Sequence, residues 1–170
     1  MTEFADGNTI VVGVDGSEAS MAALRWAAEQ ARALGTGIVA VHAWEPAGAR
    51  IAPYAPASAR RTVDEQRLEA AQLLAATIRE VFGSRIDGTV RAVVMEGPPA
   101  RVLLRQARGA LLLALGRRSH RQYELPAIGA VGRECLRHAT IPVVAVPAAD
   151  GPVSPLRAVE VSPLARSGAA

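Results

Sequence analysis

The sequence contains no lysine, and aromatic residues and cysteine are also scarce. All 19 basic residues are arginine, so chemistry that needs a side-chain amine is excluded, such as Schiff-base catalysis or a Walker-A phosphate loop. Aromatic residues make up only 4% of the 170 residues, too few for the stacking surfaces that hold single-stranded nucleic acids. The formal net charge is only +3. We therefore expect no nucleic-acid partner.

Neither a disulfide nor a membrane span is expected. Cys135 is the only cysteine, so it cannot form an internal disulfide, and we expect it to be a buried apolar filler. No run approaches the roughly 18 apolar residues of a membrane helix. The polar segment 1–8 also lacks the apolar centre of a signal peptide. These features predict a cytoplasmic protein without membrane contact.

Short β-branched runs alternate with longer alanine-rich segments of helical periodicity. The apolar runs predict strands at 9–14, 37–43, 89–95, 110–115 and 143–146. The segments between them predict helices from the N-cap Ser17 to Leu34, over 62–82, a short one opening at Pro98 and Pro99, and one over 129–138. Helical spacing places Leu34 and Val63 on the buried faces of the first two helices.

The element order is therefore βαβαβαβαβ, which is typical of an α/β fold. Right-handed crossovers turn this order into a doubly wound, five-stranded parallel sheet with helices on both faces. The predicted strand order is 3-2-1-4-5. The sequence predicts one domain over residues 1–146, followed by a proline-rich, disordered tail over 147–170.

Ligands of such sheets bind at the carboxyl ends of the strands where the strand order reverses, here between the first and fourth strands. The segment from Gly116 to Val131 reaches this point. Gly116 ends a strand, Ser119 follows after two residues, and Gly129 opens a helix after nine more. Glycines let a backbone turn and approach phosphates, and a helix N-terminus favours an anion.

The same segment is rich in side chains that could pair with phosphate, namely Arg117, Arg118, His120 and Arg121. A solvated basic loop with an ordinary glycine helix start is the alternative interpretation. The spacing alone does not decide between them.

The chain resembles the universal stress protein family over residues 8 to 147. The resemblance is carried by Ile10–Ser17, Val41–Ala43 and Leu111–Val146. ATP-binding members of this family use Gly, two residues, Gly, nine residues, and then Gly followed by Ser or Thr. Gly116 and Gly129 match this frame, whereas Ser119 replaces its second glycine and Ala130 replaces its hydroxyl residue. The resemblance implies an adenine nucleotide alpha hydrolase-like fold.

By this resemblance, backbone amides hold the phosphates of ATP at Gly116, Ser119, Gly129, Ala130 and Val131. Arg117 would add a cation, and Mg²⁺ would accompany the nucleotide.

The resemblance also assigns residues to the nucleoside. Asp15 would accept the ribose hydroxyl groups, with Ser17 beside it. Ala43 would offer backbone groups to the adenine, and Gly13 would permit close approach. From the residues alone, Asp15 can instead be a turn-forming aspartate before the N-cap Ser17.

The leading hypothesis is a stress-response module that binds ATP or AMP and hydrolyses it slowly at most. No catalytic residue is assigned, because the sequence offers no positioned general base together with metal-binding acids. No metal site is expected either, since His42, His120 and His138 lack ligand spacing.

Two alternatives belong to other classes. Ser119 and Ala130 favour a nucleotide-free homodimeric interaction module, paired through the apolar edge strand Val143–Val146. The family resemblance implies a homodimer for the leading hypothesis as well. An adenylating or pyrophosphatase enzyme is disfavoured, because the sequence lacks the His-x-Gly-His and Ser-Gly-Gly-x-Asp-Ser signatures of such enzymes.

Overall fold

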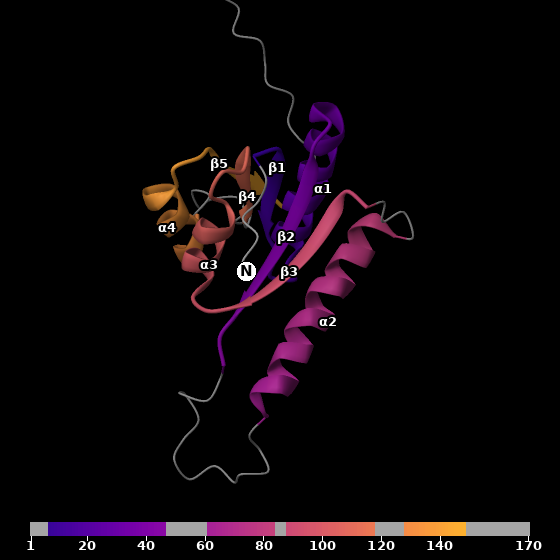
Figure 1. Ribbon diagram of the computed structural model, residues 1–170, viewed down its shortest axis with the longest axis vertical. Helices are drawn as coiled ribbons and strands as arrows, with labels where there is room; N and C mark the ends of the chain where they lie inside the picture. The colour runs from indigo at the N-terminus through magenta and orange to yellow at the C-terminus, as the bar shows by residue number, and fades with distance from the viewer. Residues whose placement is uncertain (1–6, 47–60, 84–87, 118–127, 149–170) are drawn as a thin grey trace, which may run out of the picture.

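Five parallel strands form the centre of the protein (Figure 1). The computed structural model describes residues 7–46, 61–83, 88–117 and 128–148. The strands are β1 (Thr9–Gly13), β2 (Gly37–Trp44), β3 (Val90–Glu96), β4 (Leu112–Arg117) and β5 (Val143–Pro147). Their order in the sheet is β3-β2-β1-β4-β5, and every neighbouring pair is parallel. The predicted fold class and strand order are confirmed.

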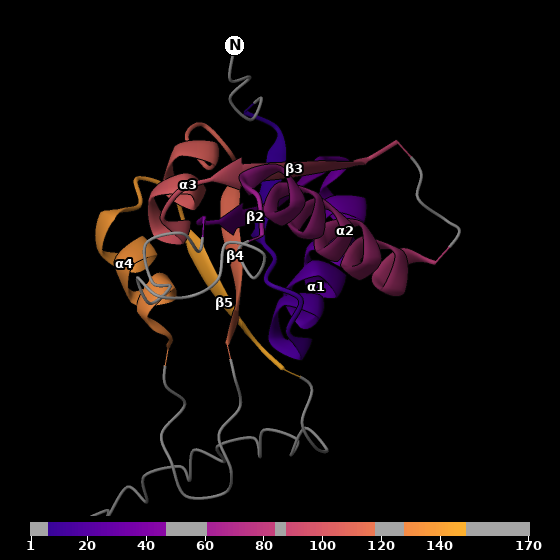
Figure 2. The same ribbon diagram turned by 90° about the horizontal axis from the view of Figure 1, so that it is seen from below.

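Two helices cover each face of the sheet (Figures 1 and 2). One face carries α1 (Glu18–Leu34) and α2 (Val63–Phe82), and the other carries α3 (Pro99–Gln106) and α4 (Ala130–His138). Successive side chains of β1 point to opposite faces, so Val12 packs with α1 and α2 while Val11 packs with α3 and α4. None of the described helices is both long and apolar enough to cross a bilayer.

Local signals in the sequence set the bounds of the two longer helices. The Ser17 hydroxyl accepts a hydrogen bond from the Ser20 amide at 3.2 Å and caps α1. Gly35 ends this helix with a φ of +63°, a conformation that glycine adopts without strain. A reciprocal capping box between Thr62 and Glu65 opens α2.

Helical spacing predicted burial correctly in the middle of α1 and α2, but the burial predicted at one end of each helix was wrong. Leu24 and Leu74 are buried, but Leu34 is 58% exposed and Val63 is 51% exposed. Leu34 is the last residue of α1 and Val63 is the first of α2. Residues at a helix end can extend past the sheet that covers the central turns, so the periodicity continues where burial does not.

Strand β4 continues beyond its predicted end. Gly116 and Arg117 are paired with Val146 and Pro147 of β5, and the Ala148 amide donates to the Arg117 carbonyl at 3.0 Å. The strand therefore ends at Arg117 and not at the predicted residue 115. The predicted tail and Ser119 lie outside the described residues, apart from Pro147 and Ala148 at the start of the tail.

Candidate functional site

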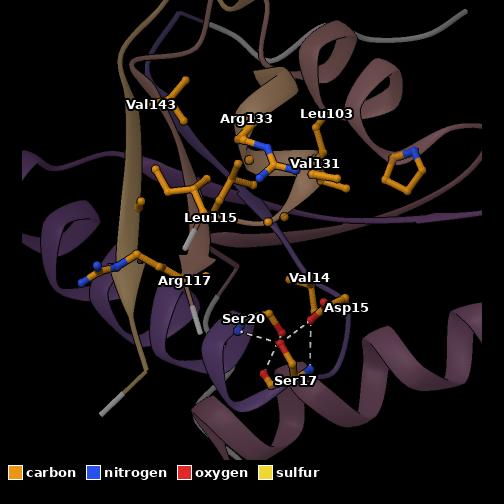
Figure 3. Close-up of a pocket in the computed structure, with 18 of the residues that line it drawn as sticks. Val14, Asp15, Ser17, Ser20, Leu103, Leu115, Arg117, Val131, Arg133 and Val143 are labelled. Carbon is orange, nitrogen blue, oxygen red and sulfur yellow. Dashed lines mark hydrogen bonds between the residues drawn. The ribbon is translucent and has the colours of Figure 1, made fainter. Parts of the chain in front are cut away.

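A cavity of about 560 Å³ opens at the carboxyl ends of β1 and β4, on the face covered by α3 and α4 (Figure 3). It lies at the predicted reversal of strand order. All predicted site residues that the structure describes line this cavity, namely Gly13, Asp15, Ser17, Ala43, Gly116, Arg117, Gly129, Ala130 and Val131. The first and last thirds of the chain thus meet in one pocket.

The turn after β1 presents a carboxylate at one side of the pocket. Asp15 Oδ1 accepts the backbone amide of Ser17 at 3.0 Å and its hydroxyl at 2.5 Å. Gly16 lies between them with a φ of +80°. The Ser20 hydroxyl donates to the Ser17 carbonyl at 2.9 Å and ties the turn to α1. Asp15 is therefore a turn former, as one interpretation held, and its exposed carboxyl group also lines the cavity.

The N-terminus of α4 forms another side of the pocket. Gly129 is its N-cap residue, and within the described residues no side chain caps the first-turn amides. The first turn also contains no acidic residue. Ala130 and Val131 line the cavity, so the positive end of the helix dipole is directed to a space that an anion could occupy.

Two glycines of the site are closely packed by other parts of the protein, Gly116 by backbone atoms and Gly13 by the ends of leucine side chains. A Cβ atom on Gly116 would lie 2.3 Å from the Ala19 carbonyl carbon and 2.6 Å from the Ser20 amide nitrogen, both backbone atoms of α1. A Cβ atom on Gly13 would lie 2.7 Å from Leu115 Cδ2. Neither glycine has a positive φ. The packing of β4 against α1, and of Leu115 over β1, accounts for both without a ligand.

Arg133 is a site residue that the sequence did not indicate. It lies on α4 one turn after Ala130 and lines the cavity. In Figure 3 its guanidinium group points to the side where Leu103 and Val131 are labelled, whereas that of Arg117 points away from the other labelled side chains. Helical spacing from Ala130 could have identified Arg133, because residues three apart share one face of a helix. Arg118 and Arg121 lie outside the described residues.

Apolar side chains from distant segments complete the walls. They are Pro99 and Leu103 of α3, Leu115 of β4, Leu136 of α4, and Val143 and Ala145 of β5. The alternation along β5 places Val143 and Ala145 on the same face. Such an apolar enclosure with few polar groups is typical of small-molecule sites.

Cys135 lies on the buried face of α4 and takes no part in the pocket lining. Its exposed fraction is 0%. Burial, with a smaller contribution from the Glu134 carboxylate, raises the pKa of the thiol to about 11. The expectation of a buried filler is confirmed.

We predict that this thiol does not react in the native protein at neutral pH. The thiolate is the reactive species, and the raised pKa keeps the thiol protonated. Because the folded-state pKa of about 11 exceeds the ordinary thiol pKa of 9.0, the unfolded chain loses this proton first, and the contribution to stability falls as pH rises from 9 to 11. Ellman's reagent should label one thiol in urea and none in buffer. Rapid labelling in buffer at pH 7.5 would contradict the prediction.

The family model described as "Universal stress protein family" matches residues 8–147. The chain belongs to this family. Universal stress protein Rv1996 of Mycobacterium tuberculosis is 32% identical over 151 residues, which cover 86% of this chain and 46% of the relative. A universal stress protein of Mycolicibacterium smegmatis is 31% identical over 137 residues, covering 81% of this chain and 45% of that protein. This chain spans about half the length of the curated relatives it matches.

Solved universal stress protein structures have the same fold. A family member from Burkholderia pseudomallei superimposes with a TM-score of 0.61 at 25% identity, covering 86% of this chain and all of that one. A universal stress protein of Archaeoglobus fulgidus in complex with dAMP superimposes with a TM-score of 0.57 at 23% identity, covering 86% of this chain and 99% of that one.

Proposed function

We propose that this universal stress protein is a regulatory module that binds an adenine nucleotide, ATP or AMP, and responds by binding and not by catalysis. The observation that carries the proposal is the composition of the pocket. The Asp15 carboxylate lies at one side, and the N-terminus of α4, whose first-turn amides are capped by no described side chain, lies at another, with apolar side chains lining the rest. An adenine nucleotide carries groups that match these walls, namely ribose hydroxyl groups for the carboxylate, an aromatic base for the apolar side chains and a phosphate for the helix N-terminus.

Each part of the nucleotide has a counterpart in the pocket. The ribose hydroxyl groups would donate to Asp15. The adenine would lie against Val41, Ala43 and the apolar walls, and the phosphates would accept the first-turn amides of α4, with Arg133 as a further cation. The dAMP complex of the Archaeoglobus fulgidus protein and a universal stress protein structure in complex with cAMP support an adenine nucleotide.

A Mg²⁺ ion would enter this site with the nucleotide. Among the residues that the structure describes, no three His, Cys, Asp or Glu side chains gather into a potential metal site. The described part of the pocket contributes one carboxylate, Asp15. Its residues therefore fit binding of a Mg²⁺–nucleotide pair through the phosphates, and they offer no protein cluster that would hold the ion alone.

The proposal is tested by binding measurements on the full chain. The purified protein is denatured and the supernatant is analysed for released nucleotide. Calorimetric titrations then use AMP, cAMP and ATP, with and without Mg²⁺, and GMP as the control for the base. We expect binding of at least one adenine nucleotide, with weaker binding of GMP. No released nucleotide together with no binding at millimolar concentrations would overturn the proposal.

Restoring the hydroxyl group of the family frame is expected to strengthen binding. Ala130 is exposed in the first turn of α4 and lines the pocket, so a serine there can donate to a phosphate without disturbing the core. We expect Ala130→Ser to bind ATP roughly 3- to 10-fold more tightly, the effect of one added hydrogen bond. Ser119→Gly in the same chain should add to the gain. An unchanged affinity in the double variant would contradict this account of the two departures.

A nucleotide-free homodimer remains a second candidate, supported by the exposed edge of the sheet. Strand β5 is an edge strand, and Val143, Val144 and Ala145 are only half-buried. Analytical ultracentrifugation of nucleotide-free protein, combined with the nucleotide titrations above, separates the candidates. A stable dimer that binds no nucleotide would favour the second.

A further inference from the structure

Val14, the residue before Asp15, makes hydrogen bonds through both its amide and its carbonyl group. The Val14 amide donates to the Val41 carbonyl at 2.9 Å. The Val14 carbonyl lies 2.7 Å from Nδ1 of His42, a half-buried residue of the neighbouring strand. Regular pairing of β1 with β2 ends one residue earlier, where Gly13 is opposite Val41. The imidazole therefore contacts the backbone where β1 leaves the sheet.

The chemistry of this contact fixes the direction of the hydrogen bond. A backbone carbonyl only accepts, so Nδ1 of His42 carries the proton and donates it. The same nitrogen carries a proton in the charged imidazolium, so the bond persists in either charge state.

This hydrogen bond acts on the peptide unit that precedes the Asp15 side chain. The Val14 carbonyl belongs to the same planar peptide unit as the Asp15 amide. Gly16, the residue after Asp15, has a φ of +80°, and glycine by itself restricts the backbone little. An anchor on the Val14–Asp15 peptide plane therefore limits the directions in which the Asp15 side chain can leave the backbone.

We propose that His42 is a positioning residue of the nucleotide site, which holds the Val14–Asp15 peptide so that the Asp15 carboxylate faces the ribose hydroxyl groups. The inference rests on the proposed function. His42 is absent from the residues that line the pocket, so it acts through Asp15 and not by contact with the nucleotide.

The test compares variants that keep or remove the donor. His42→Asn places an amide NH₂ close to the position of Nδ1, while His42→Leu removes the donor with little change in volume. His42→Gln moves the amide one bond further out and serves as a polar variant without the donor in place. His138→Leu, on the exposed end of α4 and outside the pocket lining, is the matched control.

We expect His42→Leu and His42→Gln to bind AMP roughly 5- to 20-fold more weakly than the wild type, as for the loss of one hydrogen bond at a half-buried site. His42→Asn should stay within about 3-fold, and the His138→Leu control should bind as the wild type does.

Two further measurements exclude a general loss of structure. The dideoxy analogue 2′,3′-dideoxy-AMP lacks the groups that Asp15 would contact, so wild type and His42→Leu should bind it equally. In an Asp15→Asn background, His42→Leu should weaken AMP binding no further. Equal losses for AMP and the analogue, or an additive loss in the double variant, would overturn the inference.

A measurement without nucleotide separates this inference from the proposed function. The Ser17 amide donates to Asp15 Oδ1, so its hydrogen exchange, followed by NMR, reports the order of the turn. We expect exchange to be at least about 5-fold faster in His42→Leu and unchanged in His42→Asn. If the wild type binds no nucleotide but exchange follows this pattern, the proposed function fails and His42 still positions the turn. Unchanged exchange in His42→Leu overturns the inference even if nucleotide binds.

Discussion

Replacing Gly116 with alanine is expected to destabilise the protein by about 3 kcal/mol, the upper end of the range for overpacking. The added methyl group would lie 2.3 Å from the Ala19 carbonyl carbon and 2.4 Å from its oxygen. Both are backbone atoms, so no side-chain rotation relieves the contact, and β4 must move away from α1. For a chain of this size we expect the melting temperature to fall by roughly 6–12 °C. Thermal and urea unfolding, followed by circular dichroism, measure the change.

Gly129→Ala is the matched control for this prediction. Gly129 is the other glycine of the same sequence frame, but a Cβ atom there would meet no atom of the described residues within 4 Å, and its φ is −59°. We expect a loss within about 1 kcal/mol, mostly from the weaker N-cap preference of alanine. Equal destabilisation by the two substitutions would show that the contact with α1 is not what requires glycine at position 116.

Replacing Asp15 with asparagine is expected to weaken AMP binding roughly 10- to 100-fold, because a hydrogen bond to a charged group contributes about 1.5–3 kcal/mol. Asparagine keeps an oxygen that can accept the Ser17 amide, so the turn itself should persist. Stability should therefore change by less than about 0.5 kcal/mol. Calorimetric titration and urea unfolding of the same preparation measure both quantities.

Glu80→Gln, an exposed substitution on α2 that also removes one negative charge, is the control for Asp15→Asn. It should bind AMP with wild-type affinity. Wild-type affinity in Asp15→Asn would mean that Asp15 serves only as a turn former, one of the two interpretations that the sequence left open.

The sheet could be predicted because its signals are local. Each strand is a short apolar run closed by a glycine, a proline or a polar turn, and the crossover rule converts the element order into a topology. Burial at Leu34 and Val63 could not be predicted in this way. Helical periodicity states which residues share a face, but the length of helix that the sheet covers depends on the tertiary arrangement.

The site could be predicted in part. Asp15 and Ala130 were placed correctly in the pocket, since they follow the carboxyl end of a strand and open a helix. The reason for glycine at Gly116 could not be read from spacing, because the atoms it approaches belong to Ala19 and Ser20, far away in sequence. Arg133 was not predicted because it lies inside α4, beyond the glycine frame that ends at Ala130.

The strand order has a consequence for how the protein folds. Ile10 pairs with Leu112 and Val11 with Leu113, so the two strands that carry the pocket are among the most distant partners in the chain. Contacts of high sequence separation form slowly, because a long loop must close before they contribute. During synthesis β1 and β2 can pair early, whereas the binding pocket must await β4 and α4. A nascent chain would thus acquire much of its sheet before the pocket has formed.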